Sequence, residues 1–401
     1  MSKLPFTKVR GSVTAPKGFR AGGVAAGIKP SGNKDLALVV SDLPATAAAV
    51  FTTNQVKAAP VVFNMRHVNR GTACAIVANS GNANACTGNV GMVHARAMAV
   101  AVARRIGCHE NQVFVCSTGR IGVRMPSVKI QAGIKTLLGM LSPGGGHSAA
   151  EAIMTTDTFA KECAVRFKAG GHTLTIGGIA KGAGMIHPNM ATMLAFLTTD
   201  AAVTHAPLQR ALAAAVNQSF NRISVDGDMS TNDTVILLAN GQAGHKPLSG
   251  RAWMSFQSAL NFVCAELAKL IVRDGEGVSR FVTVRVAGAT DDRDAEIAAR
   301  AVCNSVLVKT SWCGGDPNWG RLMDALGYSA AKIREGKVEI RYNGLPAVVG
   351  GMPARTPFEK LKKIVAQTEF AIDIHLHLGR GQCTMFTTDL TEQYVELNKG
   401  E

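Results

Sequence analysis

The sequence predicts a mixed α/β protein with two domains, on three observations. The chain of 401 residues is too long for one simple hydrophobic core. In its first part, apolar runs of strand length alternate with segments of helical periodicity. After Gly277 strands and helices follow one another more regularly, which indicates a smaller α/β domain over residues 280–381. We therefore expect a main domain over 1–279 and a C-terminal segment, 382–401, that returns to it.

The main domain is expected to begin with strands and helices in alternation. Residues 36–53 favour two strands around a turn at Leu43-Pro44. The later elements follow from apolar periodicity and from breaker residues: strand 72–77, helix 90–106, strand 112–116, helix 128–141, a hairpin over 163–180 turning at Gly170-Gly171, helix 207–220, strand 234–239 and helix 250–272.

The smaller domain is expected to contain strand 280–286, helix 293–308, strand 338–342, helix 356–367 and strand 370–377.

Composition and charge restrict the class of protein. Hydrophobic residues make up 47% of the chain and charged residues only 18%, which describes a compact globular protein. The net charge of +15 suits a basic proteome, anionic small molecules such as dicarboxylic amino acids, or nucleic acid. Because the basic residues are scattered and few aromatic residues lie among them, we expect no nucleic-acid partner.

The sequence also indicates the compartment. The nine cysteines contain no CxxC pair and are widely spaced, which is typical of reduced thiols in a cytoplasm. No signal peptide is visible at the N-terminus, and no apolar run reaches the ~18 residues that would span a membrane. We therefore expect a cytoplasmic protein with no membrane partner.

One stretch, KGAGMIHPNMATMLAFLTTD at 181–200, combines a loop with a buried strand and places Ala191-Thr192 where they meet. A threonine at this position suits self-cleavage, because its hydroxyl can attack the preceding carbonyl. Thr192 would then be a new N-terminus whose α-amine serves its own hydroxyl as base. An α-amine titrates near ~8, close to the working pH of a general base. The structural alternative is a strand that happens to begin with a β-branched residue.

Other polar groups admit weaker interpretations. Ser117-Thr118-Gly119, in a turn after a strand, offers a hydroxyl and a backbone N–H that suit an oxyanion hole. Asp226, Asp228 and Asp233 do not have EF-hand spacing, so a hydrogen-bonded turn is favoured over a cation site. His187 is a lone loop histidine with a structural or helper role, and His375-Leu-His377 suits a strand face. We therefore expect no metal site.

Taken together, these pieces resemble the ornithine acetyltransferase family, also called glutamate N-acetyltransferases, which are self-processing enzymes with an N-terminal threonine. The blocks that carry the resemblance lie in the right order along nearly the whole chain: ANSGNANACTG at 78–88, STG at 117–119, IMTTDT at 153–158, KGAGMIHPNMATML at 181–194, VDGDMSTND at 225–233, DGEG at 274–277, GGDPNWGR at 314–321 and DLTEQYVELN at 389–398.

The resemblance implies a fold and a reaction. The fold is a layered α/β sandwich with a second, smaller α/β domain, whose C-terminal segment returns to the active site. Cleavage between Ala191 and Thr192 gives an α chain, 1–191, and a β chain, 192–401, that assemble as an α2β2 heterotetramer. Thr192 takes the acetyl group from N-acetylornithine and passes it to glutamate in a ping-pong reaction of arginine biosynthesis. No cofactor is implied, and the sequence leaves open whether acetyl-CoA is a second donor.

The resemblance also assigns site residues. Thr118 and Gly119 match the oxyanion-hole positions beside the nucleophile. The substrate-binding positions match Thr155, Lys181, Thr192, Glu276 and Asn398. The residue chemistry agrees independently, because Lys181 offers a cation for a carboxylate and Glu276 an anion for an ammonium group, and an amino-acid substrate needs both.

Three positions depart from the family pattern. Arg120 stands where the family usually has an aliphatic residue, Met229 where it usually has a small or polar one, and the tail after Asn398 lacks the usual final Ser or Thr. The alternative functions are a related self-processing aminopeptidase or amidase, in which water is the acceptor, and a non-enzymatic basic binding module.

Overall fold

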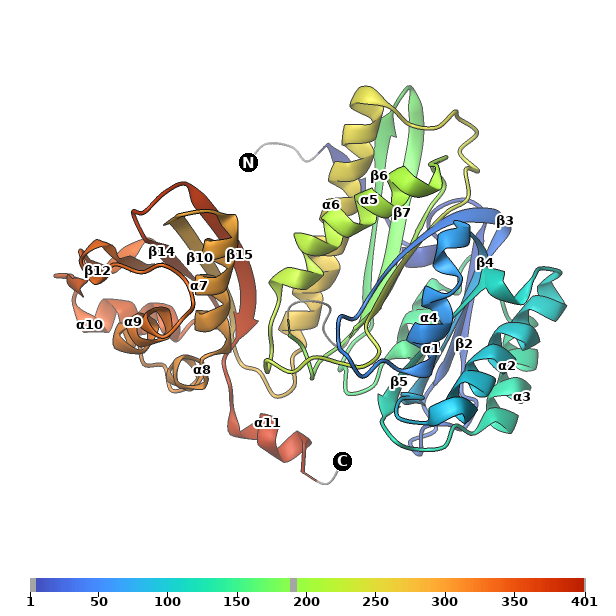
Figure 1. Cartoon of the computed structure of the whole chain (residues 1–401), viewed down its shortest axis with the longest axis horizontal. Coiled ribbons are helices and arrows are strands. Elements are labelled where there is room, and N and C mark those ends of the chain that lie inside the picture. The colour runs from blue at the N-terminus through green and yellow to red at the C-terminus, as the bar shows by residue number, and fades with distance from the viewer. Residues whose placement is uncertain (1–4, 188–192, 400–401) are drawn as a thin grey trace. The chain divides into compact units, whose positions relative to one another are not determined.

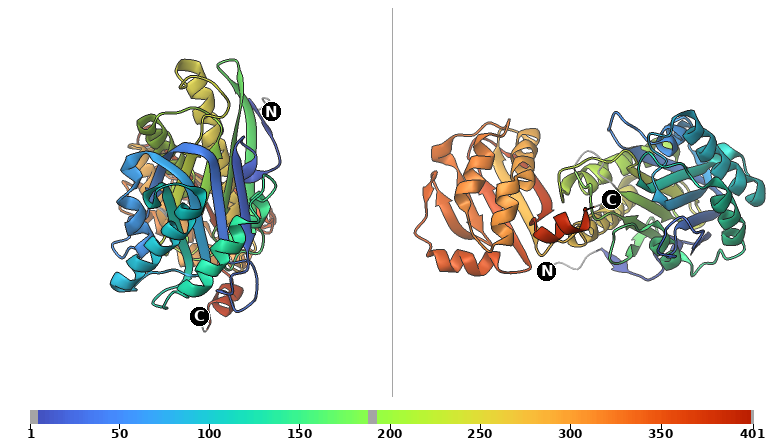
Figure 2. Two further views of the ribbon diagram at one scale, coloured as in Figure 1. Left: turned by 90° about the vertical axis from the view of Figure 1, so that its right-hand side faces the viewer. Right: turned by 90° about the horizontal axis from the view of Figure 1, so that it is seen from below.

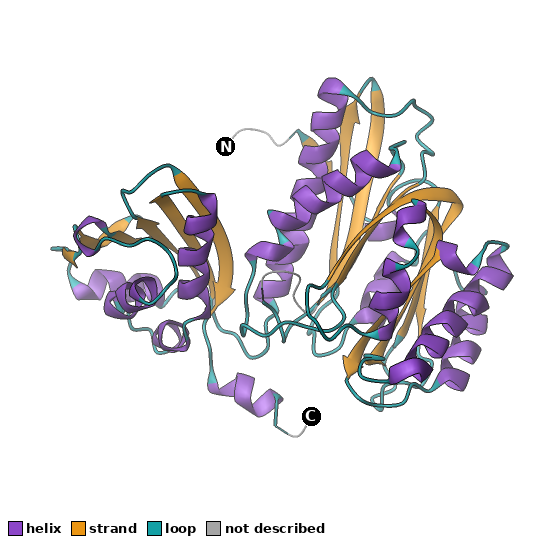
Figure 3. Cartoon of the chain, in the orientation of Figure 1, coloured by secondary structure: helices purple, strands orange, loops and turns teal. Residues whose placement is uncertain are grey.

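The structure is a computed structural model that describes residues 5–187 and 193–399. The chain forms two compact units, here called the first and the second unit. The first comprises residues 1–182, 189–221 and 229–271, and the second comprises 183–188, 222–228 and 272–401. Both combine a sheet with helices, so the predicted mixed α/β class is confirmed (Figures 1 and 3).

The first unit is built on a nine-stranded sheet in the order β1-β6-β7-β8-β9-β3-β4-β5, with β2 paired to β3. Its strands are β1 Phe6–Lys8, β2 Phe19–Val24, β3 Leu36–Phe51, β4 Thr72–Asn82, β5 Val113–Arg120, β6 Lys161–Ala169, β7 His172–Lys181, β8 Leu194–Thr199 and β9 Thr234–Ala239. The helices are α1 Ala59–Met65, α2 Gly88–Ile106, α3 Ser127–Leu138, α4 Gly146–Ile153, α5 His205–Asn217 and α6 Gly250–Arg273.

Helices cover both faces of this sheet because its strands are apolar on both faces. Helices α2 and α3 lie side by side (Figures 1 and 2) and pack on alternate residues of β3 and β4, such as Leu38 and Val77. Helix α4 packs on the residues that point to the other face of the sheet, such as Val39 and Ile76. The two faces thus bury separate apolar clusters.

By length and composition alone, helix α6 is long and apolar enough to cross a membrane. Half of its most apolar stretch is buried in the protein. A Cβ atom at Gly178 of β7 would lie 2.9 Å from Leu267 of this helix, so the two elements are in close contact. The helix is therefore part of the core of the first unit.

Two local predictions for the first unit had different outcomes. The hairpin is confirmed: β6 and β7 are antiparallel, and Gly170 and Gly171 adopt φ values of 57° and 82° between them. The expectation of two strands within 36–53 is wrong, because β3 is continuous from Leu36 to Phe51 and Leu43-Pro44 lie in a register shift between Val40 and Ala45. The breaker pair is accommodated by a bulge rather than by a turn.

The second unit contains a six-stranded sheet in the order β13-β12-β11-β14-β10-β15. Its strands are β10 Phe281–Ala289, β11 Glu339–Tyr342, β12 Leu345–Val349, β13 Met352–Pro353, β14 Glu369–His375 and β15 Gly381–Thr388. Its helices are α7 Asp292–Asn304, α8 Val306–Cys313, α9 Trp319–Gly327, α10 Phe358–Val365 and α11 Glu392–Leu397.

The second unit differs from expectation in two places. The single helix predicted over 293–308 is interrupted, because the Ser305 side chain accepts the Val308 N–H and begins α8. Residues 382–388, assigned from sequence to a returning C-terminal segment, belong to β15, which pairs with β10 along its whole length. The predicted domain ranges themselves stay predictions.

Candidate active site

The described residues on both sides of the predicted cleavage site are held by neighbouring strands. Ala191 and Thr192 lie outside the described residues. Strand β7 ends at Lys181, which pairs with Leu194, the first residue of β8. The N–H of Met193 donates to Asp233 Oδ1 at 2.9 Å, and the Met193 carbonyl accepts the N–H of Thr234 at 3.1 Å. The residue that follows Thr192 is therefore fixed from both its N–H and its carbonyl.

Asp233 is a buried carboxyl beside this strand end. Its side chain is inaccessible to solvent. Burial raises the pKa of Asp233 well above its ordinary value, against the opposing effects of the Met193 N–H and the Lys181 ammonium. Asp233 thus anchors the backbone next to the predicted nucleophile in an environment that favours the uncharged acid.

Thr118 and Gly119 lie in strand β5, so the predicted turn at 117–119 is wrong: the strand continues to Arg120, which is exposed. Gly119 pairs with Gly81 of β4 and adopts a φ of 127°. A Cβ atom at Gly119 would lie 2.4 Å from the Gly81 carbonyl carbon, so a side chain does not fit. Only glycine allows the two strands to approach this closely.

Two asparagines hold Ser117, the residue before Thr118, one at its side chain and one at its backbone. The Ser117 hydroxyl donates to Asn79 Oδ1 at 2.6 Å. The Asn232 amide donates to the carbonyl oxygens of Ser117 at 2.8 Å and Ala83 at 2.6 Å. Since Asn232 directly precedes Asp233, the same loop fixes both the predicted oxyanion residues and the strand end after Thr192. An oxyanion site needs donors that are held in place before the charge develops.

Lys181 belongs to a cluster of buried charges around Asp157, a residue that sequence reasoning did not single out. The side chains of Asp157 and Lys161 are fully buried, and that of Lys181 is 2% exposed. Asp157 lies 2.6 Å from the Lys161 ammonium and 3.9 Å from that of Lys181. Burial alone would raise the pKa of Asp157, but the two ammonium groups hold it below its ordinary value.

Asp157 also reaches the predicted substrate residue Thr155. Its Oδ2 accepts the Thr155 N–H at 2.8 Å, and its Oδ1 accepts the Gly182 N–H at 2.7 Å. The structure therefore brings Thr155 and Lys181 together through one carboxylate. The signal in the sequence was the position of Asp157 inside the IMTTDT block.

The second unit holds the other two predicted substrate residues. Glu276 is 9% exposed, and its Oε2 accepts the amide of Asn398 at 2.8 Å. A Cβ atom at Gly184 would lie 2.4 Å from the Glu276 carboxyl carbon, so the loop before the cleavage site passes directly over this carboxylate. Asn398 itself is exposed at the end of α11. Here too the structure brings two predicted residues together.

The acidic loop after Val225 is a hydrogen-bonded turn, in agreement with the preferred interpretation. Asp226 accepts the N–H groups of Met185, at 2.5 Å, and Ile186, at 2.8 Å. His187 lies 3.3 Å from the Asn304 amide, and burial lowers the pKa of this histidine. Within the described ranges, no group of three or more His, Cys, Asp or Glu side chains could hold a metal ion.

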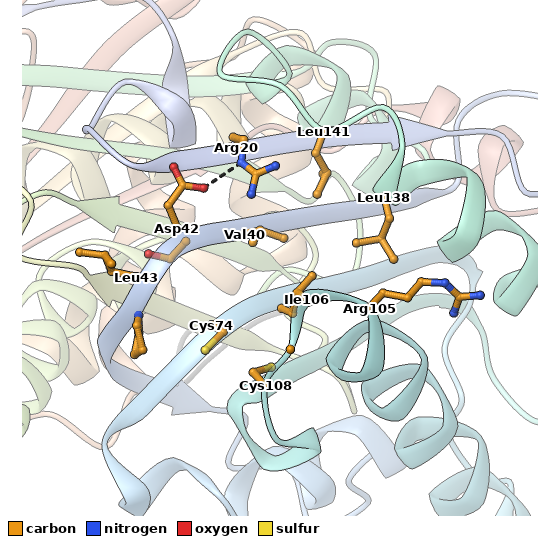
Figure 4. A pocket seen from close by; sticks show the side chains of 13 residues that line it. Arg20, Val40, Asp42, Leu43, Cys74, Arg105, Ile106, Cys108, Leu138 and Leu141 are labelled. Carbon is orange, nitrogen blue, oxygen red and sulfur yellow. Dashed lines mark hydrogen bonds and ion pairs between the residues drawn. The ribbon is translucent and has the colours of Figure 1, made fainter.

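A pocket of about 460 Å³ opens elsewhere in the first unit, among β3, α2 and α3 (Figure 4). The Arg20 guanidinium there is paired with Asp42 at 2.8 Å, and Cys74, Arg105 and Cys108 also line the pocket. None of the predicted site residues is among the thirteen that line it. The pocket is therefore separate from the candidate active site.

A fixed backbone at the predicted oxyanion position, a buried ammonium group and a strand end anchored at Met193 fit the class of acyltransferases. Comparisons with known proteins specify this class. The model of the ArgJ family matches residues 20–400. The chain belongs to the ArgJ family, and it is an acetyltransferase of arginine biosynthesis.

Two relatives that share one name match over nearly their whole length. The arginine biosynthesis bifunctional protein ArgJ of Geobacter sulfurreducens is 51% identical over 385 residues, covering 95% of this chain and 98% of that protein. The protein of the same name from Symbiobacterium thermophilum is 50% identical over 97% of this chain and 98% of its own length. A crystal structure of arginine biosynthesis bifunctional protein argJ from Bacillus halodurans matches with a TM-score of 0.50 and 38% identity, over 51% of this chain and 98% of that chain.

Proposed function

We propose that this chain is a glutamate N-acetyltransferase that moves the acetyl group from N-acetylornithine to L-glutamate through an acetyl-Thr192 intermediate. One structural observation carries the proposal. The buried ammonium group of Lys181 lies on the strand residue that pairs with Leu194, two positions after Thr192. A cation for an amino-acid carboxylate is therefore built into the strand pair that presents the nucleophile.

The reaction begins with self-cleavage. The Thr192 hydroxyl attacks the Ala191 carbonyl, and the peptide C–N bond breaks to leave an ester and a free Thr192 α-amine. Water then hydrolyses that ester, which gives Ala191 a carboxylate and restores the Thr192 hydroxyl. The Bacillus halodurans chain supports this step, because it is matched over 98% of its length by only 51% of this chain and is thus about half as long. Cleavage would give chains 1–191 and 192–401, which we propose assemble as an α2β2 heterotetramer in the cytoplasm.

Acetyl transfer then proceeds in two halves. The Thr192 α-amine takes the proton of its own hydroxyl, whose oxygen attacks the acetyl carbonyl of N-acetylornithine. The C–N bond breaks, the proton passes to the leaving amine, and ornithine departs. The α-amine of glutamate attacks the acetyl ester in turn and restores the threonine hydroxyl. Thr118 and Gly119 stabilise the oxyanion in both halves.

Four residues are proposed to bind the substrate. Lys181 and Thr155 bind the α-carboxylate that donor and acceptor share. Glu276 and Asn398 bind an ammonium group, since a carboxylate and an amide oxygen are its natural acceptors. The word bifunctional in the names of the relatives supports a second donor, which we propose is acetyl-CoA. No resident cofactor is needed for either donor.

Mass spectrometry of the purified protein tests the proposal. It should reveal a fragment that begins at Thr192, and Thr192→Ala should abolish both splitting and acetyl transfer, a loss of at least about 10⁴-fold. Thr204→Ala is the matched control, because Thr204 is exposed and makes no capping hydrogen bond with its side chain.

Full-length protein that transfers acetyl groups without splitting would contradict the mechanism. Release of acetate in the presence of glutamate, without acetylglutamate, would instead identify a hydrolase of the aminopeptidase or amidase kind.

A further inference from the structure

Asp157 accepts hydrogen bonds at both carboxylate oxygens in a fully buried environment. Oδ1 binds the Lys161 ammonium at 2.6 Å and the Gly182 N–H at 2.7 Å, and Oδ2 binds the Thr155 N–H at 2.8 Å. These donors come from the loop after α4, from the first residue of β6 and from the residue after β7. The carboxylate thereby ties three segments of the first unit together at one point.

The two lysines stand in different relations to this carboxylate. Lys161 is within hydrogen-bond distance, whereas the Lys181 ammonium lies 3.9 Å from Oδ2, beyond the reach of a hydrogen bond. At this distance the attraction between opposite charges persists in a buried site, because little water screens it. Asp157 therefore favours the charged form of Lys181 without accepting a hydrogen bond from it.

Lys161 explains why Asp157 does not move closer to Lys181. The hydrogen bonds from Lys161 and Gly182 hold Oδ1, and the Thr155 N–H holds Oδ2. A carboxylate with three such bonds has little freedom to rotate toward a fourth donor. Lys161 thus fixes the position of the Asp157 carboxylate. Asp157 in turn contacts the two residues that are proposed to bind substrate, Lys181 and Thr155.

We propose that Asp157, held by Lys161, is a positioning residue that presents the Lys181 ammonium and the Thr155 backbone to the α-carboxylate shared by donor and acceptor. The inference rests on the proposed function, because it concerns the substrate of that same site. It adds to it the reason why one site can serve two amino acids that differ in side-chain charge. The common carboxylate is recognised by a cation whose place is fixed before either substrate arrives.

Asp157→Asn tests the inference in the full-length, self-cleaved protein. The variant should raise KM for glutamate and for N-acetylornithine roughly 10- to 100-fold, the factor expected when the Thr155 N–H and the Lys161 ammonium lose their charged acceptor. The value of kcat should change less than about 3-fold, because the variant leaves Thr192 and the oxyanion residues in place. Asp200→Asn is the matched control: Asp200 is also buried and accepts two backbone N–H groups, from Thr175 and Lys17, at the far end of β8.

Two readouts separate positioning from a merely structural role. With an acceptor whose α-carboxylate is replaced by a carboxamide, Asp157→Asn should cause no further rise in KM, because the group that Lys181 would bind is absent. The ratio of variant KM to parent KM should also grow as the pH rises. The negative charge of Asp157, 3.9 Å from the Lys181 ammonium, favours the charged form of that ammonium, and the variant removes it.

Each outcome decides the question. If the parent protein makes no acetylglutamate, the proposed function fails, whatever Asp157 does. If the parent is active and Asp157→Asn has parental KM values, or raises KM equally for the carboxamide acceptor, the inference is overturned. If Asp157→Asn does not fold or does not cleave itself, Lys161→Met decides instead. Asp157 would then be held by the Gly182 and Thr155 N–H groups alone and should shift toward Lys181, which should raise both KM values; unchanged values would reject the proposal.

Discussion

The predicted substrate groups of the two units are held in different ways. In the first unit, Lys181 and Thr155 are fixed by a buried carboxylate and by paired strands. In the second unit, Glu276 meets Asn398, an exposed residue at the end of the short helix α11. The first arrangement suits the carboxylate that every substrate shares. The second suits a contact that can adjust to the part of the substrate that differs.

Gly119→Ala tests whether the backbone of the first unit must be rigid, and it has the largest expected effect. A methyl group there would meet the backbone of Gly81 at 2.4 Å, at a φ of 127°. We expect kcat to fall roughly 10²- to 10³-fold, because the proposed oxyanion donors move, and the free energy of unfolding to fall by about 2–4 kcal/mol. Initial rates and urea denaturation measure the two effects.

Gly122→Ala is the control for that variant. Gly122 also has a positive φ, 76°, but a Cβ atom there would have no neighbour within 4 Å. Only the backbone preference is lost, which costs about 1 kcal/mol and should leave kcat unchanged. Equal losses in the two variants would mean that the close approach of β4 and β5 has no role in catalysis.

Lys181→Met and Glu276→Gln compare the two arrangements directly, one variant in each unit. The first removes a buried cation and leaves part of its charged surroundings unmatched, so KM for both amino-acid substrates should rise about 100-fold or more. The second keeps a polar side chain that can still bond to Asn398, so KM should rise only about 10-fold. Steady-state kinetics with each substrate measures both. Similar increases would show that the two arrangements contribute alike.

Local features of the fold could be predicted from the sequence, and contacts between distant segments could not. The hairpin at Gly170-Gly171 depends on residues that are neighbours in the chain, and it was predicted correctly. The continuity of β3 through Leu43-Pro44 depends on its pairing with β4 and β9 on either side of the register shift. The local sequence does not show whether pairing with neighbouring strands will keep the strand continuous, with the breaker pair in a bulge.

The candidate site shows the same division. The motif blocks identified Lys181 and Thr155, but not the carboxylate that joins them, because the contact requires β7 to end beside the loop after α4. Lys161 lies outside every block, and a lone lysine at the start of a strand is typical of an exposed position. Its side chain is fully buried in an ion pair with Asp157, four residues earlier, and the strand pattern alone does not show that this position is buried.

Asp226→Asn tests a loop of the second unit and has the smallest expected effect. Burial raises the pKa of Asp226 to about 6, even though three backbone N–H groups favour its charged form. A carboxyl whose pKa is raised by folding binds more protons in the folded than in the unfolded state, so its contribution lowers stability as the pH rises from about 4 to about 6. Above that range the loss is complete.

Removing the charge at Asp226 should therefore make the protein relatively more stable at pH 7.5 than at pH 5, compared with the parent. Urea denaturation at the two pH values measures this difference, which should remain modest because Asp226 is partly exposed. Asp228→Asn is the control, since Asp228 is exposed on the same loop. A parent whose stability rises between pH 4 and 6 relative to Asp226→Asn would show that the bonds to Met185 and Ile186 outweigh burial, and that this loop is held as firmly as the buried carboxylate of the first unit.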